Sequence, residues 1–164
     1  MAVSPVFNLS STTHLGSTDI ENRMYPARFP PQMSFEVGSV LSLPRSWSDN
    51  FNLVYQRLLL AELKVSEWPI TTSEDFRVLK SGGCVHLVEV DLRKMGVGLN
   101  SKRLLETPTN LFGMNSMDLS QADRLPSLVE NAGFADVQVH KKGWALHGNL
   151  VYCPEKMLSG VIRD

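Results

Sequence analysis

Groups able to do chemistry stand at the ends of two apolar segments of this chain. Tyr55 and Arg57 follow the short apolar run at residues 51–54, and Glu89 closes a second run at residues 84–90. If both runs are parallel strands, their carboxyl ends meet at one edge of a sheet, where α/β proteins bind ligands. A phenol, a cation and a carboxylate there can orient a polar substrate or move a proton. The alternative is a solvated surface with an ion pair of little consequence.

The elements that would position these groups alternate between strand and helix. The pattern predicts strands at residues 15–20, 34–37, 51–54, 84–90 and 137–140, and helices at residues 56–63, 71–79 and 123–132. Leu59, Leu60 and Leu63 lie at helical spacing in the first of these helices. The Gly82-Gly83 pair supplies the left-handed conformation that ends the second helix. Such alternation implies a mostly parallel sheet covered by helices.

Composition narrows the classes of function. The chain has 164 residues, 43% of them hydrophobic and 20% charged, with a formal net charge of −1. This balance gives no long-range attraction for a phosphate backbone, and no apolar run approaches the ~20 residues that span a bilayer. Residues 1–9 lack the features of a signal peptide. We therefore expect a cytoplasmic protein without nucleic-acid or membrane partners, and the scattered histidines and cysteines predict no metal site.

Three segments carry a resemblance to one family. FNLVYQRLLLAELKVSEWP, FRVLKSGGCVHLVEVD and ADRLPSLVENAGFADVQV are similar to the central and later parts of class I S-adenosylmethionine-dependent methyltransferases. The chain most resembles the fungal secondary-metabolite group, of LaeA-like or UMTA type, and the similarity covers residues 15–142. The second and third segments are fairly specific together and weak singly.

The resemblance implies cofactor roles for four residues. The segment LGSTD places Asp19 where the family has the acid that binds the cofactor ribose. FEVGSVLSLP resembles the adenine-side strand and loop, with Gly38 followed by Ser39 where the family usually has an acid. That departure weakens the adenine contact. If a cofactor binds, we expect Asp19, Gly38, Ser39 and Gln56 to contact it.

The same resemblance implies where an acceptor would bind. His147 and Trp144 lie in a glycine-flanked segment where related enzymes place part of the acceptor pocket, although Trp144 can equally cover the core. Met114 borders a segment that forms a lid in the family, or else fills the core. Asp91 adds a carboxylate at the sheet edge. We predict Tyr55, Arg57, Glu89 and His147 as catalytic residues, and Asp91, Trp144 and Met114 as substrate-binding residues.

One part of the family pattern has no counterpart in this sequence. Parallel strands joined through a helix need a dozen or more connecting residues, whereas only residues 10–14 separate Leu9 from Leu15. Residues 6–11 are either a relic of the missing strand or an unrelated start. We predict an α/β fold with a truncated Rossmann-like methyltransferase sheet, mostly parallel, with helices on both faces and with the first strand and its glycine loop missing or replaced.

The chain is expected to form a single domain over residues 1–164. This domain comprises an irregular start at 1–14, a family-like core at 15–142 and a C-terminal loop with a possible last strand at 143–164. Residues 149–163 look barely long enough for that closing strand. A missing central strand leaves backbone groups unpaired. Either the N-terminal segment or a second copy of the chain fills the gap, and the second possibility predicts a homodimer.

Three functions fit these observations. In the first, which we prefer, an enzyme has lost methyl transfer, needs no cofactor and uses the retained pocket to isomerise, cyclise or dehydrate a small natural-product intermediate. In the second, the chain remains an S-adenosylmethionine-dependent methyltransferase on a small molecule, and dimerisation completes its cofactor site. In the third, it is a non-catalytic partner of a full-length relative.

Overall fold

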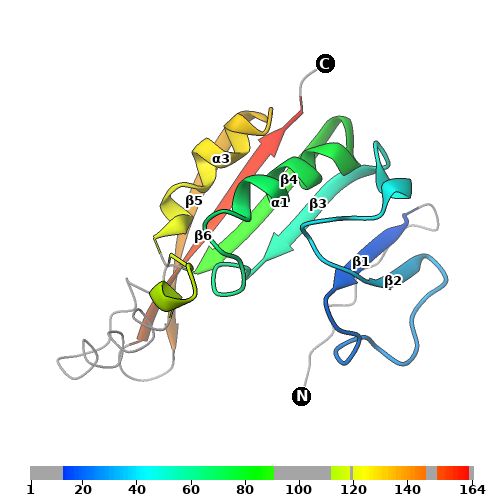
Figure 1. Ribbon diagram of the computed structural model, residues 1–164, viewed down its shortest axis with the longest axis horizontal. Coiled ribbons are helices and arrows are strands. Elements are labelled where there is room, and N and C mark those ends of the chain that lie inside the picture. Colours follow the sequence, from blue (N-terminus) through cyan, green and yellow to red (C-terminus); the bar gives the residue numbers. More distant parts are fainter. Residues whose placement is uncertain (1–12, 91–111, 119, 147–150, 163–164) are drawn as a thin grey trace. The chain divides into compact units, whose positions relative to one another are not determined.

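The computed structural model describes residues 13–90, 112–118, 120–146 and 151–162 of the chain (Figure 1). Its contacts divide the chain into two compact units, Met1–Leu43 and Pro44–Asp164, here called the N-terminal and C-terminal units. Each unit contains its own β-sheet. The organisation as a single domain over residues 1–164 therefore stays a prediction.

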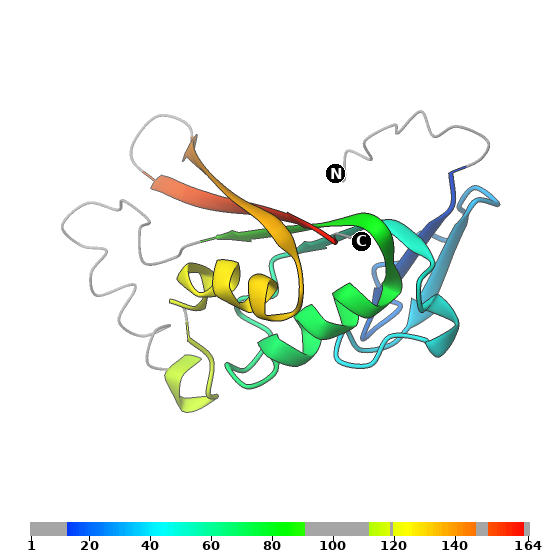
Figure 2. The same ribbon diagram turned by 90° about the horizontal axis from the view of Figure 1, so that it is seen from above.

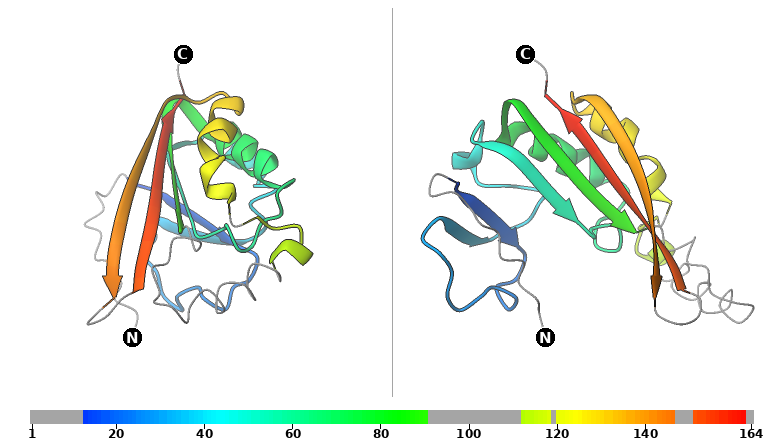
Figure 3. Two further views of the ribbon diagram at one scale, coloured as in Figure 1. Left: turned by 90° about the vertical axis from the view of Figure 1, so that its left-hand side faces the viewer. Right: turned by 180° about the vertical axis from the view of Figure 1, so that it is seen from behind.

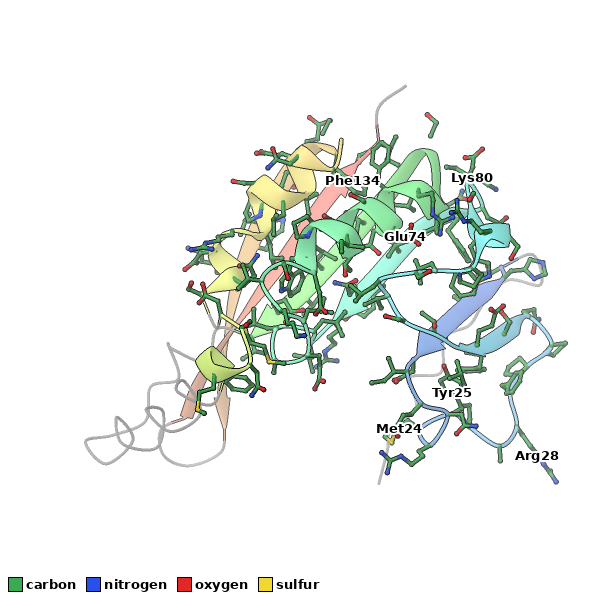
Figure 4. All side chains as sticks on the ribbon, viewed as in Figure 1. Met24, Tyr25, Arg28, Glu74, Lys80 and Phe134 are labelled. Carbon is green, nitrogen blue, oxygen red and sulfur yellow. The ribbon has the colours of Figure 1, made fainter. Side chains whose placement is uncertain are left out.

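The N-terminal unit contains two parallel strands, as the sequence pattern predicted. Strand β1 (Leu15–Asp19) pairs in register with β2 (Met33–Val37), so that their carboxyl ends lie side by side. Aromatic rings support the pair: Tyr25 and Phe29 pack on Phe35 of β2 with ring centroids 4.9 and 4.8 Å away. Figure 4 shows Tyr25 on the loop that joins the two strands, together with Met24 and Arg28. The connection between the strands is thus a loop braced by aromatic side chains.

The C-terminal unit contains a four-stranded sheet in the order β3-β4-β6-β5. Its strands are β3 (Phe51–Arg57), β4 (Leu79–Val90), β5 (Ala135–Leu146) and β6 (Val151–Val161). Strands β3 and β4 are parallel, and β6 runs antiparallel to both β4 and β5. With 11 residues inserted between two long strands, β6 is a complete closing strand. The possible last strand predicted within residues 143–164 is thus present as β6, whereas residues 143–146 belong to β5.

Two helices pack on this sheet, and both lie on the same face (Figures 2 and 3). They are α1 (Trp68–Val78) and α3 (Leu125–Asn131), and short 3-10 turns η1 (Arg45–Trp47) and η3 (Gln121–Asp123) precede β3 and α3. Each helix carries a proline in its first turn, where a helix amide has no intrahelical acceptor. On the opposite face the described residues place no helix, so the predicted helices on both faces are not found in this part of the chain. No helix among the described residues has the length and apolar character needed to cross a membrane.

The core of the C-terminal unit lies between the helices and the inner face of the sheet. Val85 and Leu87 alternate along β4 toward this layer and are buried, as is Trp68 at the start of α1. Phe134, which follows α3 and is labelled in Figure 4, meets Phe76 of α1 edge to face, with ring centroids 5.2 Å apart. This ring pair joins the end of one helix to the end of the other.

Two predicted helix boundaries differ from the structure. The predicted helix at residues 56–63 is wrong, because β3 continues to Arg57 and Leu58 then adopts a left-handed conformation with φ of 60°. Helix α1 begins at Trp68 and ends at Val78, so Gly82 does not end it. Gly82, with φ of 74°, instead lies inside β4. The predicted strands at 84–90 and 137–140 are parts of the longer strands β4 and β5.

Candidate functional site at the carboxyl ends of the strands

Strand β3 brings three of the predicted site residues to its carboxyl end. Tyr55 is 58% exposed and Arg57 is exposed, whereas Gln56 between them is buried. This alternation follows from the pleat of a strand, which turns successive side chains to opposite faces. Gln56 is paired in register with buried Leu87 on the helix-covered face. Tyr55 and Arg57 therefore project together from the other face, and Gln56 does not join them.

A tight turn follows β3 and is fixed by strand β4. The amide of Leu58 donates to the carbonyl oxygen of Val88 at 3.0 Å. The next two amides turn toward a side chain: Leu59 donates to Oε1 of Glu89 at 2.8 Å, and Leu60 donates to Oε2 at 3.1 Å. Both carboxylate oxygens of Glu89 thus hold the main chain of the turn.

Glu89 is the buried acid of this site, with 1% of its surface exposed. Burial raises its pKa to about 7, and the hydrogen bonds from Leu59 and Leu60 oppose that rise. The sequence led us to expect a carboxylate near Arg57. Among the described residues, the Glu89 carboxylate is held by main-chain amides and no ion pair joins it to Arg57. Its catalytic role stays a prediction.

The N-terminal unit holds the residues to which the resemblance gives cofactor roles. Asp19 is exposed at the carboxyl end of β1, and its Oδ1 accepts the Glu21 amide at 3.2 Å. Its carbonyl oxygen accepts the amide of Gly38, which directly follows β2, at 2.9 Å. Asp19 and Gly38 are therefore neighbours at one edge of this sheet. The hydroxyl of Ser39 accepts the Leu41 amide at 3.2 Å and so closes a local turn.

Sequence reasoning missed Tyr25, which fastens this edge. Its hydroxyl donates to the carbonyl oxygen of Glu36 at 2.5 Å and lies 3.5 Å from that of Asp19. Tyr25 thereby links the carboxyl ends of β1 and β2. A tyrosine beside Pro26 in an irregular segment gave no sequence signal for this role.

The remaining predicted site residues are partly within the described range. Met114 is exposed, and its segment is tied to the loop after β3 because Val65 donates its amide to the carbonyl oxygen of Ser116 at 3.0 Å. Trp144 belongs to β5, opposite Cys153 of β6. Asp91 and His147 lie outside the described residues.

Comparison with known proteins identifies the fold. No family model matches the chain. Over 54 residues it is 41% identical to N-methyltransferase gliN of Aspergillus fumigatus, a match that covers 32% of this chain and 19% of gliN. A solved S-adenosylmethionine-dependent methyltransferase from Methanosarcina mazei superposes with a TM-score of 0.58 at 14% identity, covering 95% of both chains. The chain has a methyltransferase fold.

A second solved structure supports the methyltransferase fold and bears on the cofactor. Phosphoethanolamine N-methyltransferase 2 of Haemonchus contortus, in complex with phosphomonomethylethanolamine and S-adenosylhomocysteine, has a TM-score of 0.56 at 13% identity. The match covers 81% of this chain and 38% of that one, and the same enzyme has been solved with S-adenosylmethionine. Our prediction that the chain needs no cofactor is contradicted by these complexes. The predicted Rossmann-like α/β methyltransferase architecture is confirmed.

Proposed function

We propose that this chain serves an S-adenosylmethionine-dependent methyltransferase that acts on a small molecule. The methyltransferase fold and the partial similarity to gliN support this function over a cofactor-free isomerisation, cyclisation or dehydration, for which no comparison offers support. The observation that carries the proposal is the exposed carboxylate of Asp19 at the carboxyl end of a parallel strand, beside Gly38. Open α/β sheets bind nucleotide cofactors at that end.

The local geometry of Asp19 fits a ribose. One carboxylate oxygen accepts the Glu21 amide, which fixes the side chain, and the exposed group keeps lone pairs free for hydroxyl donors. Hydrogen bonds from adjacent ribose hydroxyls to an acid at this place are the usual nucleotide contact in such sheets. Bound S-adenosylmethionine would supply an electrophilic methyl group. Asp19 would hold its ribose, and Ser39, which follows Gly38, would be near the adenine.

The residues at the end of β3 are our proposed acceptor contacts. Arg57 offers fixed donors to an anionic or carbonyl group of the acceptor, and the exposed ring of Tyr55 offers an apolar face with a polar tip. Because gliN is named an N-methyltransferase, amines are the first acceptor class to assay. Orientation of the acceptor by these two side chains, rather than proton transfer, is the contribution that their exposure supports.

Calorimetric titration with S-adenosylhomocysteine tests the proposal. We expect the wild-type protein to bind, and Asp19→Ala to weaken binding by about tenfold or more, since charged hydrogen bonds to the ribose are lost. Glu21→Gln is the matched control, because it neutralises an exposed acid two residues away and keeps the amide that Asp19 accepts. Absence of binding in the wild type, or equal affinities in wild type and Asp19→Ala, would contradict the proposal.

A further inference from the structure

The turn after β3 has an unusual internal support. Three consecutive amides, those of Leu58, Leu59 and Leu60, all point at strand β4. Successive main-chain amides that converge in this way form a concavity suited to an anion. Here the carboxylate of Glu89 occupies it, with one oxygen on each of the last two amides at 2.8 and 3.1 Å. The turn is therefore held by a side chain that lies 30 residues away along the sequence.

The turn needs such support because its first residue is strained. Leu58 has φ of 60°, which is a left-handed backbone conformation. A residue with a Cβ adopts this conformation only when its surroundings impose it. Its side chain is half exposed, so packing in the core does not impose that conformation. The three hydrogen bonds from the turn to β4 impose it instead.

Burying a carboxylate at this position costs free energy. Glu89 is almost fully buried, and an apolar side chain of the same volume would avoid the cost of removing a charge from water. The elements around it also carry charged and titratable residues. They are Arg57 of β3, Glu74, Asp75 and Arg77 of α1, Glu155 and Lys156 of β6, Lys80 and His86 of its own strand, and Glu62, Lys64 and Glu67 of the loop. The two contacts that its oxygens make are with main-chain amides. Glu89 thus fixes the position of the turn, and it does not add to the free energy of unfolding.

We propose that Glu89 is a positioning residue whose carboxylate clasps the Leu59 and Leu60 amides, so that the turn presents Arg57 and Tyr55 to the acceptor at the carboxyl end of β3. This inference rests on the proposed function, since it assigns Glu89 a task within that site. It also replaces the catalytic role that the sequence suggested, because both oxygens are occupied and shielded from a substrate. We call this arrangement the Glu89 clasp.

Variants that separate hydrogen bonding from volume test the Glu89 clasp. Glu89→Met fills a similar volume but accepts no hydrogen bond, and Glu89→Gln can still accept one of the two. We expect both to remain folded and to bind S-adenosylhomocysteine as the wild type does, with kcat/KM for the assayed amine acceptor reduced severalfold in Glu89→Gln and about tenfold or more in Glu89→Met. Glu62→Gln, at an exposed acid of the same loop, is the matched control and should turn over the amine acceptor as the wild type does.

A spectroscopic measurement tests the clasp without any ligand. In the ¹⁵N-labelled wild type, the amide resonances of Leu59 and Leu60 should shift across neutral pH, together and with one midpoint, as Glu89 titrates. In Glu89→Gln that transition should disappear, and in Asp75→Asn it should persist, which excludes the other buried acid as its source. A purely space-filling role for Glu89 would leave no such link between these amides and its ionisation.

The two measurements fail in different ways. Wild-type kcat/KM for the amine acceptor in a folded Glu89→Met variant, or amides of Leu59 and Leu60 that do not follow Glu89, would overturn the clasp. If the wild type binds no S-adenosylhomocysteine while the amide transition is present and depends on Glu89, the turn is clasped as described but the proposed function fails, and with it the role of the clasp in that site.

Discussion

At the scale of single residues, Asp75 is the other buried acid of the C-terminal unit. It lies on the inner face of α1 with 3% of its surface exposed, and its Oδ2 has no hydrogen-bond partner among the described residues. Burial, and to a smaller extent the neighbouring charge of Glu74, raises its pKa from 3.8 to about 7. A carboxyl group in this environment folds most favourably with its proton bound.

This shift makes stability depend on pH in a definite direction. Between pH 3.8 and about 7 the unfolded chain releases the proton of Asp75 while the folded chain keeps it. The free energy of unfolding therefore falls as pH rises through that window, and the loss is complete above it. Three pKa units correspond to about 4 kcal/mol. Glu89, whose pKa is raised from 4.5 to about 7, acts in the same direction.

Asp75→Asn should remove the part of this dependence that Asp75 contributes and leave the part that Glu89 contributes. We expect urea unfolding to show a smaller loss of stability between acid and weakly alkaline buffer in Asp75→Asn than in the wild type, and a more stable variant at the alkaline end. Glu130→Gln, an exposed acid on α3, serves as the control and should retain the wild-type pH slope. If Asp75→Asn also retained it, the side chain would be ionised and solvated, contrary to its burial.

At the scale of elements, strands and helices α1 and α3 could be predicted from the sequence, but the predicted helix at residues 56–63 does not exist. Alternating or continuous apolar runs marked β1, β2 and the carboxyl-terminal part of β4, because burial on a sheet imposes those patterns directly. The spacing of Leu59, Leu60 and Leu63 also indicated burial. Leu60 and Leu63 are buried, but they lie in an irregular loop. What prevents a helix there is the contact with Glu89 and the conformation of Leu58, and periodicity carries no information on a contact so distant in sequence.

The sequence likewise predicted only some features of the candidate site. Asp19 was predicted from the family resemblance, and Arg57 because it follows a strand that the pattern revealed; in the structure each ends a strand, where such sheets bind ligands. Glu89 was also found, but its partners were not: a sequence gives the charge of an acid without saying which amides will surround it. Tyr25 was missed because its hydroxyl bonds to carbonyl oxygens, and main-chain acceptors have no sequence signature.

The junction between α3 and β5 depends on a glycine. Gly133 has φ of 110°, and a Cβ added there would lie 2.8 Å from Cε2 of Phe76. Gly133→Ala should therefore lower the free energy of unfolding by about 2 kcal/mol or more, from backbone strain and from displacement of the Phe76 ring. Gly113→Ala is a matched substitution with open space around the new methyl group, and it should change stability by less than about 0.5 kcal/mol. Chemical denaturation compares the two, and equal effects would refute the argument.

At the scale of the whole molecule, the described residues leave edge strands in both sheets. β3 is an edge strand of the four-stranded sheet, and both strands of the N-terminal unit are edges of a two-stranded sheet, which is marginal by itself. The opposite edge strand, β5, carries Lys141 and Lys142, charges of the kind that discourage edge-to-edge pairing. β3 instead exposes Leu53 and Tyr55. An edge with exposed apolar side chains favours association.

We therefore expect a homodimer that forms through β3. Leu53 is 51% exposed on this strand, and Leu53→Lys would place a charge where two copies meet. Light scattering coupled to size-exclusion chromatography should give a dimer for the wild type and a monomer for Leu53→Lys. Val139→Lys introduces the same charge at a 40% exposed position of β5 and should leave the dimer intact. A wild type that is monomeric at every concentration would exclude the dimer, and dissociation by Val139→Lys alone would move the interface to the other edge, where the lysines ought to oppose it.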